Sequence, residues 1–512
     1  MEQKGRRVPK VKPRILTSSG LGQPWRGSER PKAIPHSEAP PFGVGTTRGA
    51  AMASALTAPS LSKSSLQKAA QNHWLIYVLV VSPVLFRVSR YVFSVATRGA
   101  AEPLSILEIA LFLAILYQVN IHWLFLHKPL VTLSRSDLFV SLFVLAAGIS
   151  VIALIYEPVD HTESLKAFVR LTEYVTLYLI VSTNIRSWEA IRKLMMFLVS
   201  CGVAVSLLAI IQYVIGPLAS TGLFPWGTWW AAFNPSSSFR AYSFFLNPLY
   251  VSAYLSIVWP INLGLLMGQN KGKKRTLYVI ALLVNSAGIL ITFCRSGLVA
   301  LAVALFPFVR ERARIAVAGG ALVFLVGSYI IPNQLRVRVF LEDQESRDSI
   351  TTRIDRYKQG LETYASHPLF GVGLGNYVSY LAGGDIGYEG HGYVKPTLAD
   401  VLEYSKQMED VGNYTAENTI LQYAGELGTF GLLAFVALCV HFLVSLWRLR
   451  KKSSAAEGWI VGLFAGLLAF LVCSMFTTFT AVEMNSMFWV VLGIAKAVWL
   501  RRPRSRIGEI AA

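Results

Sequence analysis

Long apolar runs recur along almost the whole chain, and they restrict the fold more than any other feature of the sequence. Hydrophobic residues make up 54% of the 512 residues, and charged residues only 15%. A helix needs about 20 apolar residues to cross a bilayer, and it satisfies its backbone hydrogen bonds within its own segment. The sequence therefore predicts an all-α, polytopic membrane protein rather than a soluble globular domain.

About twelve transmembrane helices can be drawn along the chain. Each has roughly the length that a bilayer requires, except the short run at 297–309. They are predicted at 74–94, 104–126, 137–156, 165–184, 194–215, 249–268, 276–294, 297–309, 313–332, 428–447, 458–476 and 484–500. The resulting organisation is a basic tail at 1–72, helices within 73–332, a long loop at 333–427, helices within 428–500 and a tail at 501–512.

Basic residues between these runs set the predicted orientation. With the N-terminus inside, the inside connectors and the C-terminal tail carry twenty Lys and Arg, whereas the outside connectors at 157–164 and 477–483 carry none. The positive-inside rule then places both termini in the cytoplasm. The tail at 1–72 has twelve Lys and Arg against three Glu. It is predicted to be disordered and suits an anionic membrane surface, so the net charge of +19 does not indicate a nucleic-acid partner.

Two of the predicted outside loops are long, at 216–248 and 333–427. The aromatic residues of the first loop are interpreted as an interfacial belt with no catalytic role. In the second loop, apolar residues recur at helical spacing over 349–365, namely Ile350, Ile354, Tyr357, Leu361 and Tyr364. This pattern predicts an amphipathic helix that lies on the membrane or on the helix bundle and ends before Pro368.

Three predicted outside sites each present an arginine. Arg240 precedes Asn247 and Pro248, Arg295 lies in a tight turn before Ser296 and Gly297, and Arg353 is expected on the polar side of the loop helix. A guanidinium group stays ionised and binds phosphate oxygens through two parallel N–H groups, so the three arginines indicate a diphosphate ligand. Each arginine taken alone is also compatible with an interfacial anchor.

Glu417 is the best placed carboxylate. It lies at the start of a predicted helix, which begins at Glu417-Asn418 and continues to Gly428 and Gly431. It could accept a proton from a sugar hydroxyl, or it could only stabilise the helix N-terminus. The glycine-rich stretch from Gly371 to Gly375 lacks the strand–turn–helix context of a phosphate loop and is interpreted as a turn. The histidines lack metal-ligand spacing, so the sequence predicts no metal and no cofactor. The four cysteines are interpreted as small packing residues.

In combination these motifs resemble the bacterial O-antigen ligase and O-antigen polymerase superfamily. The resemblance covers roughly residues 238–440 and rests on four motifs in the family's order. They are Arg240 with Asn247-Pro248, Arg295-Ser296-Gly297, the stretch from His367-Pro368 to Gly375-Asn376, and Asn418 followed by nine residues, Gly428 and Gly431.

The resemblance implies an inverting, metal-independent glycosyltransferase of the bacterial inner membrane. Its donor would be an undecaprenyl-diphosphate-linked glycan, and its acceptor a saccharide or a lipid A-core type glycan in the periplasm. Arg240 and Arg295 would bind the diphosphate, Arg353 and Asn418 would assist binding, and Glu417 would orient or deprotonate the acceptor. Membrane lipids and other polysaccharide-assembly proteins are the further partners expected.

One departure from the family pattern affects this interpretation. The ligases carry a histidine before the asparagine, where this chain has Glu417. A carboxylate can still serve as a base, so ligase and polymerase are both expected activities. Two alternatives stay open at this point: a polytopic transporter or flippase, and a non-catalytic scaffold of a polysaccharide export system.

Overall fold

The structure is a computed structural model, and it describes the parts of the chain that position the candidate site. The described residues are 76–82, 106–117, 133–153, 161–185, 187–219, 240–245, 247–269, 272–309, 344–378, 380–381, 415–450, 458–479 and 482–501. All of them lie in one compact unit, Ser62–Ala512. The tail at 1–72, the loop tip around 382–414 and the predicted span at 313–332 lie outside the described residues.

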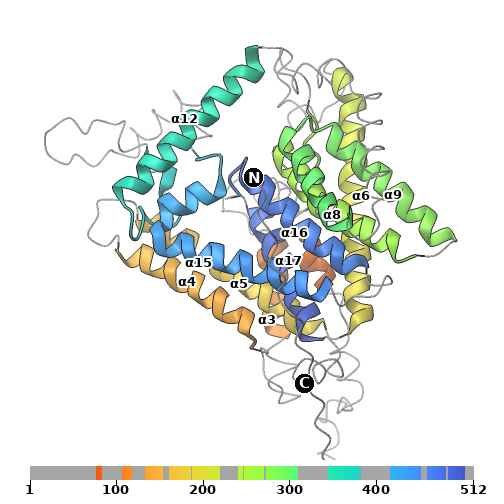
Figure 1. The fold of residues 1–512 in the computed structure, drawn as a ribbon, viewed down its shortest axis with the longest axis horizontal. Helices are drawn as coiled ribbons and strands as arrows, with labels where there is room; N and C mark the ends of the chain where they lie inside the picture. Colours follow the sequence, from red (N-terminus) through yellow and green to blue (C-terminus); the bar gives the residue numbers. More distant parts are fainter. Residues whose placement is uncertain are drawn as a thin grey trace, which may run out of the picture. The chain divides into compact units, whose positions relative to one another are not determined.

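Helices make up nearly all of this described part, which contains no strand (Figure 1). The longer ones are α3 (Ile106–Tyr117), α4 (Arg135–Ala153), α5 (His161–Asn184), α6 (Trp188–Ala219), α8 (Pro248–Met267), α9 (Lys273–Leu290), a short helix at Arg295–Val309, α12 (Gln344–Ser366), α15 (Thr419–Arg450), α16 (Gly458–Ser474) and α17 (Val482–Leu500). The expected all-α class is confirmed for these residues.

Four of the described helices are long and apolar enough to cross a membrane. They are Arg135–Ala153, Trp188–Val214, Pro248–Met267 and Thr419–Arg450, and Arg295–Val309 and Gly458–Ser474 are shorter apolar helices. The helices α3, α5, α9 and α17 also fall where spans are expected. The total of about twelve spans stays a prediction.

Helices α8 and α16 pack closely because three glycines follow one another at four-residue intervals on α16. A Cβ atom added at Gly458 or Gly462 would lie 2.5 Å from a backbone oxygen of α8, and one added at Gly466 would lie 2.7 Å from the oxygen of Ile257. Small residues at this spacing let helix backbones approach each other within a membrane. This contact fixes the direction of α16, whose C-terminal end belongs to the candidate site.

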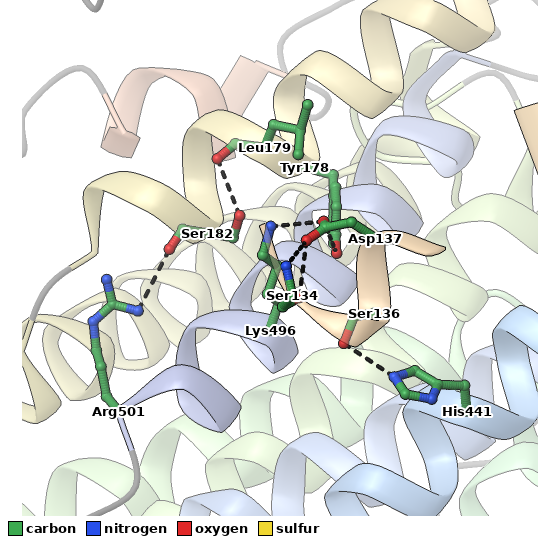
Figure 2. Close-up of polar contacts among 9 residues, drawn as sticks. All are labelled: Ser134, Ser136, Asp137, Tyr178, Leu179, Ser182, His441, Lys496 and Arg501. Carbon is green, nitrogen blue, oxygen red and sulfur yellow. Dashed lines mark hydrogen bonds and ion pairs between the residues drawn. The ribbon is translucent and has the colours of Figure 1, made fainter. Parts of the chain in front are cut away.

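A buried ion pair joins the first turn of α4 to α17. Lys496 Nζ lies 2.7 Å from Asp137 Oδ1, and the two side chains are 0% and 10% exposed. Tyr178 of α5 donates a 3.0 Å hydrogen bond to the same oxygen, and Ser134 Oγ donates to Oδ2 at 2.9 Å (Figure 2). Charges inside a membrane protein are retained where they are paired in this way.

Helix α12 contains the helix expected at 349–365, and it ends at Ser366, just before Pro368. Its packed face is nevertheless the polar one. Gly360 and Thr363 are buried and the arginines at 353 and 356 are mostly buried, whereas Ile354 and Leu361 are 48% and 54% exposed. Arg353 is therefore on the polar face as expected, but this face packs against the bundle. Of the apolar residues at helical spacing, Tyr357 and Tyr364 also contact the bundle, whereas Ile354 and Leu361 point away from it.

Candidate active site

The start of α15 is fixed by hydrogen bonds of the Asn418 and Thr419 side chains. Asn418 caps the helix, because its Oδ1 accepts hydrogen bonds from the backbone N–H groups of Ile420 at 2.9 Å and Leu421 at 3.2 Å. Thr419 Oγ1 donates to the carbonyl of Thr477 and accepts from the N–H of Phe479, both at 3.0 Å. The first turn of α15 is thereby attached to the connection between α16 and α17.

Glu417 lies one residue before this cap, in a backbone conformation that few residues other than glycine adopt. Its φ is +46°, in the left-handed region that is uncommon for residues other than glycine. The carboxylate does not turn back to the helix; it pairs with α12. Oε2 lies 3.1 Å from Arg353 Nε, and Oε1 lies 3.7 Å from Arg356 Nε. Two of the predicted site residues, Arg353 and Glu417, are therefore in direct contact.

The two arginines are held in place by further contacts. Arg353 Nη1 donates to the carbonyl of Phe476 at 3.2 Å, and the Tyr357 hydroxyl donates to the carbonyl of Met475 at 3.0 Å. Burial raises the pKa of Tyr357, so this hydroxyl keeps the proton that it donates. Arg356 Nη1 is buried with no hydrogen-bond partner among the described residues. The arginines of α12, Glu417 and the chain after α16 thus form one cluster.

A second attachment joins α12 and α15: the segment after α12 contacts α15 at a kink. Gly428 breaks the helical geometry of α15 with φ +65° and ψ −163°. The N–H groups of Val372 and Gly373 donate to the carbonyls of Gly425 at 2.8 Å and Glu426 at 2.9 Å. A Cβ atom at Gly428 would lie 2.3 Å from the carbonyl oxygen of Leu369, so this approach requires glycine. The glycine-rich stretch is a turn, as expected, and its role is to bind α15.

Arg240 and Arg295 belong to a second group of residues. Arg240 Nε donates to the carbonyl of Thr292 at 3.0 Å, and its Nη2 lies 2.9 Å from Cys294 Sγ. Arg295 is half-buried and begins the short helix directly after this turn. A Cβ atom at Gly297 would lie 1.8 Å from Ser252 Oγ of α8, so Gly297 lets the turn pack against that helix. The structure therefore brings Arg240 to the turn that presents Arg295.

Both groups reach the C-terminal end of α16. Cys473 Sγ lies 3.9 Å from the carbonyl oxygen of Ser296, next to Arg295. Three residues later, the carbonyl of Phe476 accepts from Arg353. Ser296 of the second group and Arg353 of the first group thus both contact the C-terminal end of α16 or the residues just after it. Arg353 and Glu417 are also paired with each other. All four cysteines are free, and three of them are buried, as expected for packing residues.

Two members of the site were not assigned a role from the sequence. Arg356 and Tyr357 lie on α12 beside Arg353 and take part in the same cluster. The spacing of three residues between Arg353 and Arg356 is the signal that could have found the second arginine, because it places both on one face of a helix. No spacing rule in the sequence points to the backbone carbonyls of Met475 and Phe476.

The histidines and acidic residues do not assemble into a metal site in the described part of the chain. No group of three His, Cys, Asp or Glu side chains there could hold an ion. His367 instead lies 3.0 Å from Ser366 Oγ through its Nδ1 atom, and its ring contacts that of Tyr380 edge-on. His391 lies outside the described residues.

Part of the chain matches a known protein family. No curated protein matches the chain. Residues 277–436 match the family described as O-antigen ligase. The matched segment runs from α9 into α15, and it contains Arg295, Arg353, Arg356, Glu417 and Asn418 but not Arg240. This match supports the assignment of the chain to the O-antigen ligase superfamily, the family whose motifs it resembles.

Proposed function

We propose that the protein is an inverting membrane glycosyltransferase. It moves a glycan from undecaprenyl diphosphate to a saccharide or lipid-glycan acceptor, as a ligase or a polysaccharide polymerase. The observation that carries this proposal is the contact of Glu417 with two arginines of α12. A carboxylate that can accept a proton lies beside guanidinium groups that can bind phosphate oxygens, which are the two kinds of group the reaction needs.

In the proposed reaction, an acceptor hydroxyl oxygen attacks the anomeric carbon of the donor sugar. The bond between this carbon and the diphosphate oxygen breaks, and undecaprenyl diphosphate leaves with the electron pair. Glu417 receives the proton of the hydroxyl. Arg240, Arg295 and Arg353 stabilise the negative charge that develops on the leaving diphosphate, which is the main electrostatic contribution. Asn418 fixes the start of α15 and thereby the position of Glu417.

We place this site on the periplasmic face of the inner membrane, with both termini in the cytoplasm. The contacts support this topology, because they join helix ends that the topology assigns to the same side of the membrane. Thr419 contacts Thr477, and Ser296 contacts Cys473, at the predicted outer face. Asp137 and Lys496 meet at the predicted inner face. The exposed Ile354 and Leu361 of α12 suit a helix lying at the membrane surface.

Cysteine labelling tests this topology in a cysteine-free background. Asp160→Cys, Asp385→Cys and Thr480→Cys should react with an impermeant maleimide added to spheroplasts. Ser453→Cys should react only after permeabilisation. The proposed orientation is wrong if Ser453→Cys reacts in sealed spheroplasts.

Glu417→Gln tests the chemistry. Glutamine keeps the size of the side chain but cannot take up the proton, so transfer should fall by about 10²- to 10⁴-fold, the usual contribution of a general base. The assay is transfer from a purified undecaprenyl-diphosphate glycan in liposomes. Asp355→Asn is the matched control, because Asp355 is an exposed carboxylate of α12 that pairs with Lys358. Full activity of Glu417→Gln would exclude Glu417 as the base, and an inactive wild type would favour the scaffold.

A further inference from the structure

The pairing of Glu417 with α12 leaves the cluster positively charged. One carboxylate lies between two guanidinium groups, so the three side chains carry a net charge of +1 (two positive charges and one negative). All three are only partly exposed, at 24% for Arg353, 18% for Arg356 and 25% for Glu417. An anion with more than one negative charge would match the two arginines better than a single carboxylate does.

The arginines also have donor capacity that the carboxylate does not use. Each guanidinium offers five N–H groups in a fixed plane. Glu417 faces the Nε atom of each arginine, and Phe476 accepts from one terminal nitrogen of Arg353. Arg356 Nη1 is buried and has no partner among the described residues. A terminal nitrogen removed from water without a partner favours a ligand that supplies an acceptor.

Glu417 itself is held in a conformation that its backbone disfavours. Its φ of +46° is unusual for a side chain with a Cβ atom, and such conformations persist only where the surroundings stabilise them. The contacts that stabilise this one include the two ion pairs with α12. If another anion took over the arginines, residue 417 would be able to change its backbone conformation and release its carboxylate.

We propose that the donor diphosphate displaces the Glu417 carboxylate from Arg353 and Arg356, so that donor binding itself frees the base. This inference rests on the proposed function, and it adds Arg356 as a diphosphate-binding residue. Carboxylate and phosphate oxygens compete for the same guanidinium edges. Glu417 therefore has two positions: paired with α12 before the donor binds, and turned to the acceptor hydroxyl afterwards. The reaction is ordered, with the donor binding before a productive acceptor.

Binding of inorganic pyrophosphate to the full-length protein in nanodiscs tests the competition. Removing the competing carboxylate should increase the affinity, so Glu417→Gln should bind pyrophosphate about tenfold more tightly than the wild type, which corresponds to about 1.4 kcal/mol. Arg356→Lys should weaken binding at least about threefold, because lysine lacks the planar pair of donors. Titration calorimetry measures both values.

Asp355→Asn is the matched control, since it removes one negative charge, as Glu417→Gln does, but at an exposed position of α12. Its affinity should stay within about twofold of the wild type. Equal tightening in Asp355→Asn and Glu417→Gln would overturn the proposal, because the charge alone would then explain the gain. Unchanged or weaker binding by Glu417→Gln would also overturn it.

A second variant and a second assay keep the result interpretable. Glu417→His also removes the carboxylate, and it replaces Glu417→Gln if that variant does not fold; it should show the same gain in affinity. Transfer by the wild type is measured separately with the lipid-linked donor. Tighter pyrophosphate binding by the variants together with an inactive wild type would support the competition and refute the proposed reaction.

Discussion

The molecule contains two clusters in which a carboxylate meets a cation, and they differ in how completely the charges are matched. In the first cluster, Lys496 pairs one-to-one with Asp137, and Tyr178 and Ser134 donate to the remaining acceptor positions (Figure 2). In the second cluster, Glu417 is shared by Arg353 and Arg356. The first cluster is closed, whereas the second has positive charge and N–H groups in excess.

Burial separates the clusters in the same direction. The Lys496 side chain is 0% exposed, while the side chains of Glu417 and its two arginines are between 18% and 25% exposed. A fully buried pair cannot exchange its partner without leaving a charge in an apolar environment. A partly exposed pair with excess positive charge can exchange its partner for another anion. We infer that each charge of the first cluster needs its partner, whereas the second cluster can accept another anion.

The largest effect is expected for Lys496→Met, which would leave Asp137 buried without its cation. Removing one partner of a buried pair costs about 3–5 kcal/mol of the free energy of unfolding. Unfolding of the purified protein in mixed micelles by a denaturing detergent measures the loss. The control is Lys193→Met, in a pair with Glu189 whose side chains are 61% and 76% exposed, and it should leave the free energy of unfolding nearly unchanged. Equal stability of the two variants would contradict the interpretation of the first cluster as a buried pair whose charges need each other.

A smaller effect, on activity rather than stability, is expected for lysine at Arg240, Arg295 or Arg353. Lysine keeps the charge but loses the planar pair of donors, so transfer should fall at least about tenfold, or about 1.4 kcal/mol. The free energy of unfolding should change by less than about 1 kcal/mol at the partly exposed position 353. Liposome transfer and detergent unfolding are measured on the same preparations. Normal transfer in all three variants would leave these residues as interfacial anchors.

The smallest effect is expected when both charges of the closed cluster are removed together. Asp137→Asn combined with Lys496→Met leaves no unpaired charge, and asparagine can still accept from Tyr178. The double variant should unfold within about 1 kcal/mol of the wild type, because replacing a whole buried pair is often nearly neutral. If it is as unstable as Lys496→Met alone, the pair contributes more than the avoidance of a buried charge.

The sequence predicted the helical class and the positions of most described helices, because apolar runs of bilayer length have few alternatives. It also predicted the helix α12 and its end before Pro368, since Pro disfavours helical continuation. It did not predict which face of α12 would pack. The apolar residues Ile354 and Leu361 would be expected on the packed face, yet Arg353 and Thr363 face the bundle. In a membrane protein the apolar side can face lipid, so an amphipathic pattern alone does not identify the packed side.

The candidate site was predictable in its residue types but not in its pairing. Arginine and glutamate on the outer face indicated an anion site and a base, and the structure places Arg353 against Glu417. The carbonyls that hold Arg353 and Tyr357 belong to Phe476 and Met475, far along the chain. Contacts over such separations follow from packing, and no local pattern records them.

The fixed contact of Gly428 with the carbonyl of Leu369 also determines the angle at which Glu417 meets α12. The helical stretch between them begins at Thr419 and runs without a break to Leu427. Each residue of a helix turns the chain by about 100° and advances it by about 1.5 Å. One residue inserted into this stretch would rotate Glu417 to a different side of the axis while Gly428 stayed in place. The number of residues in the first turns of α15 therefore sets whether the carboxylate faces the arginines.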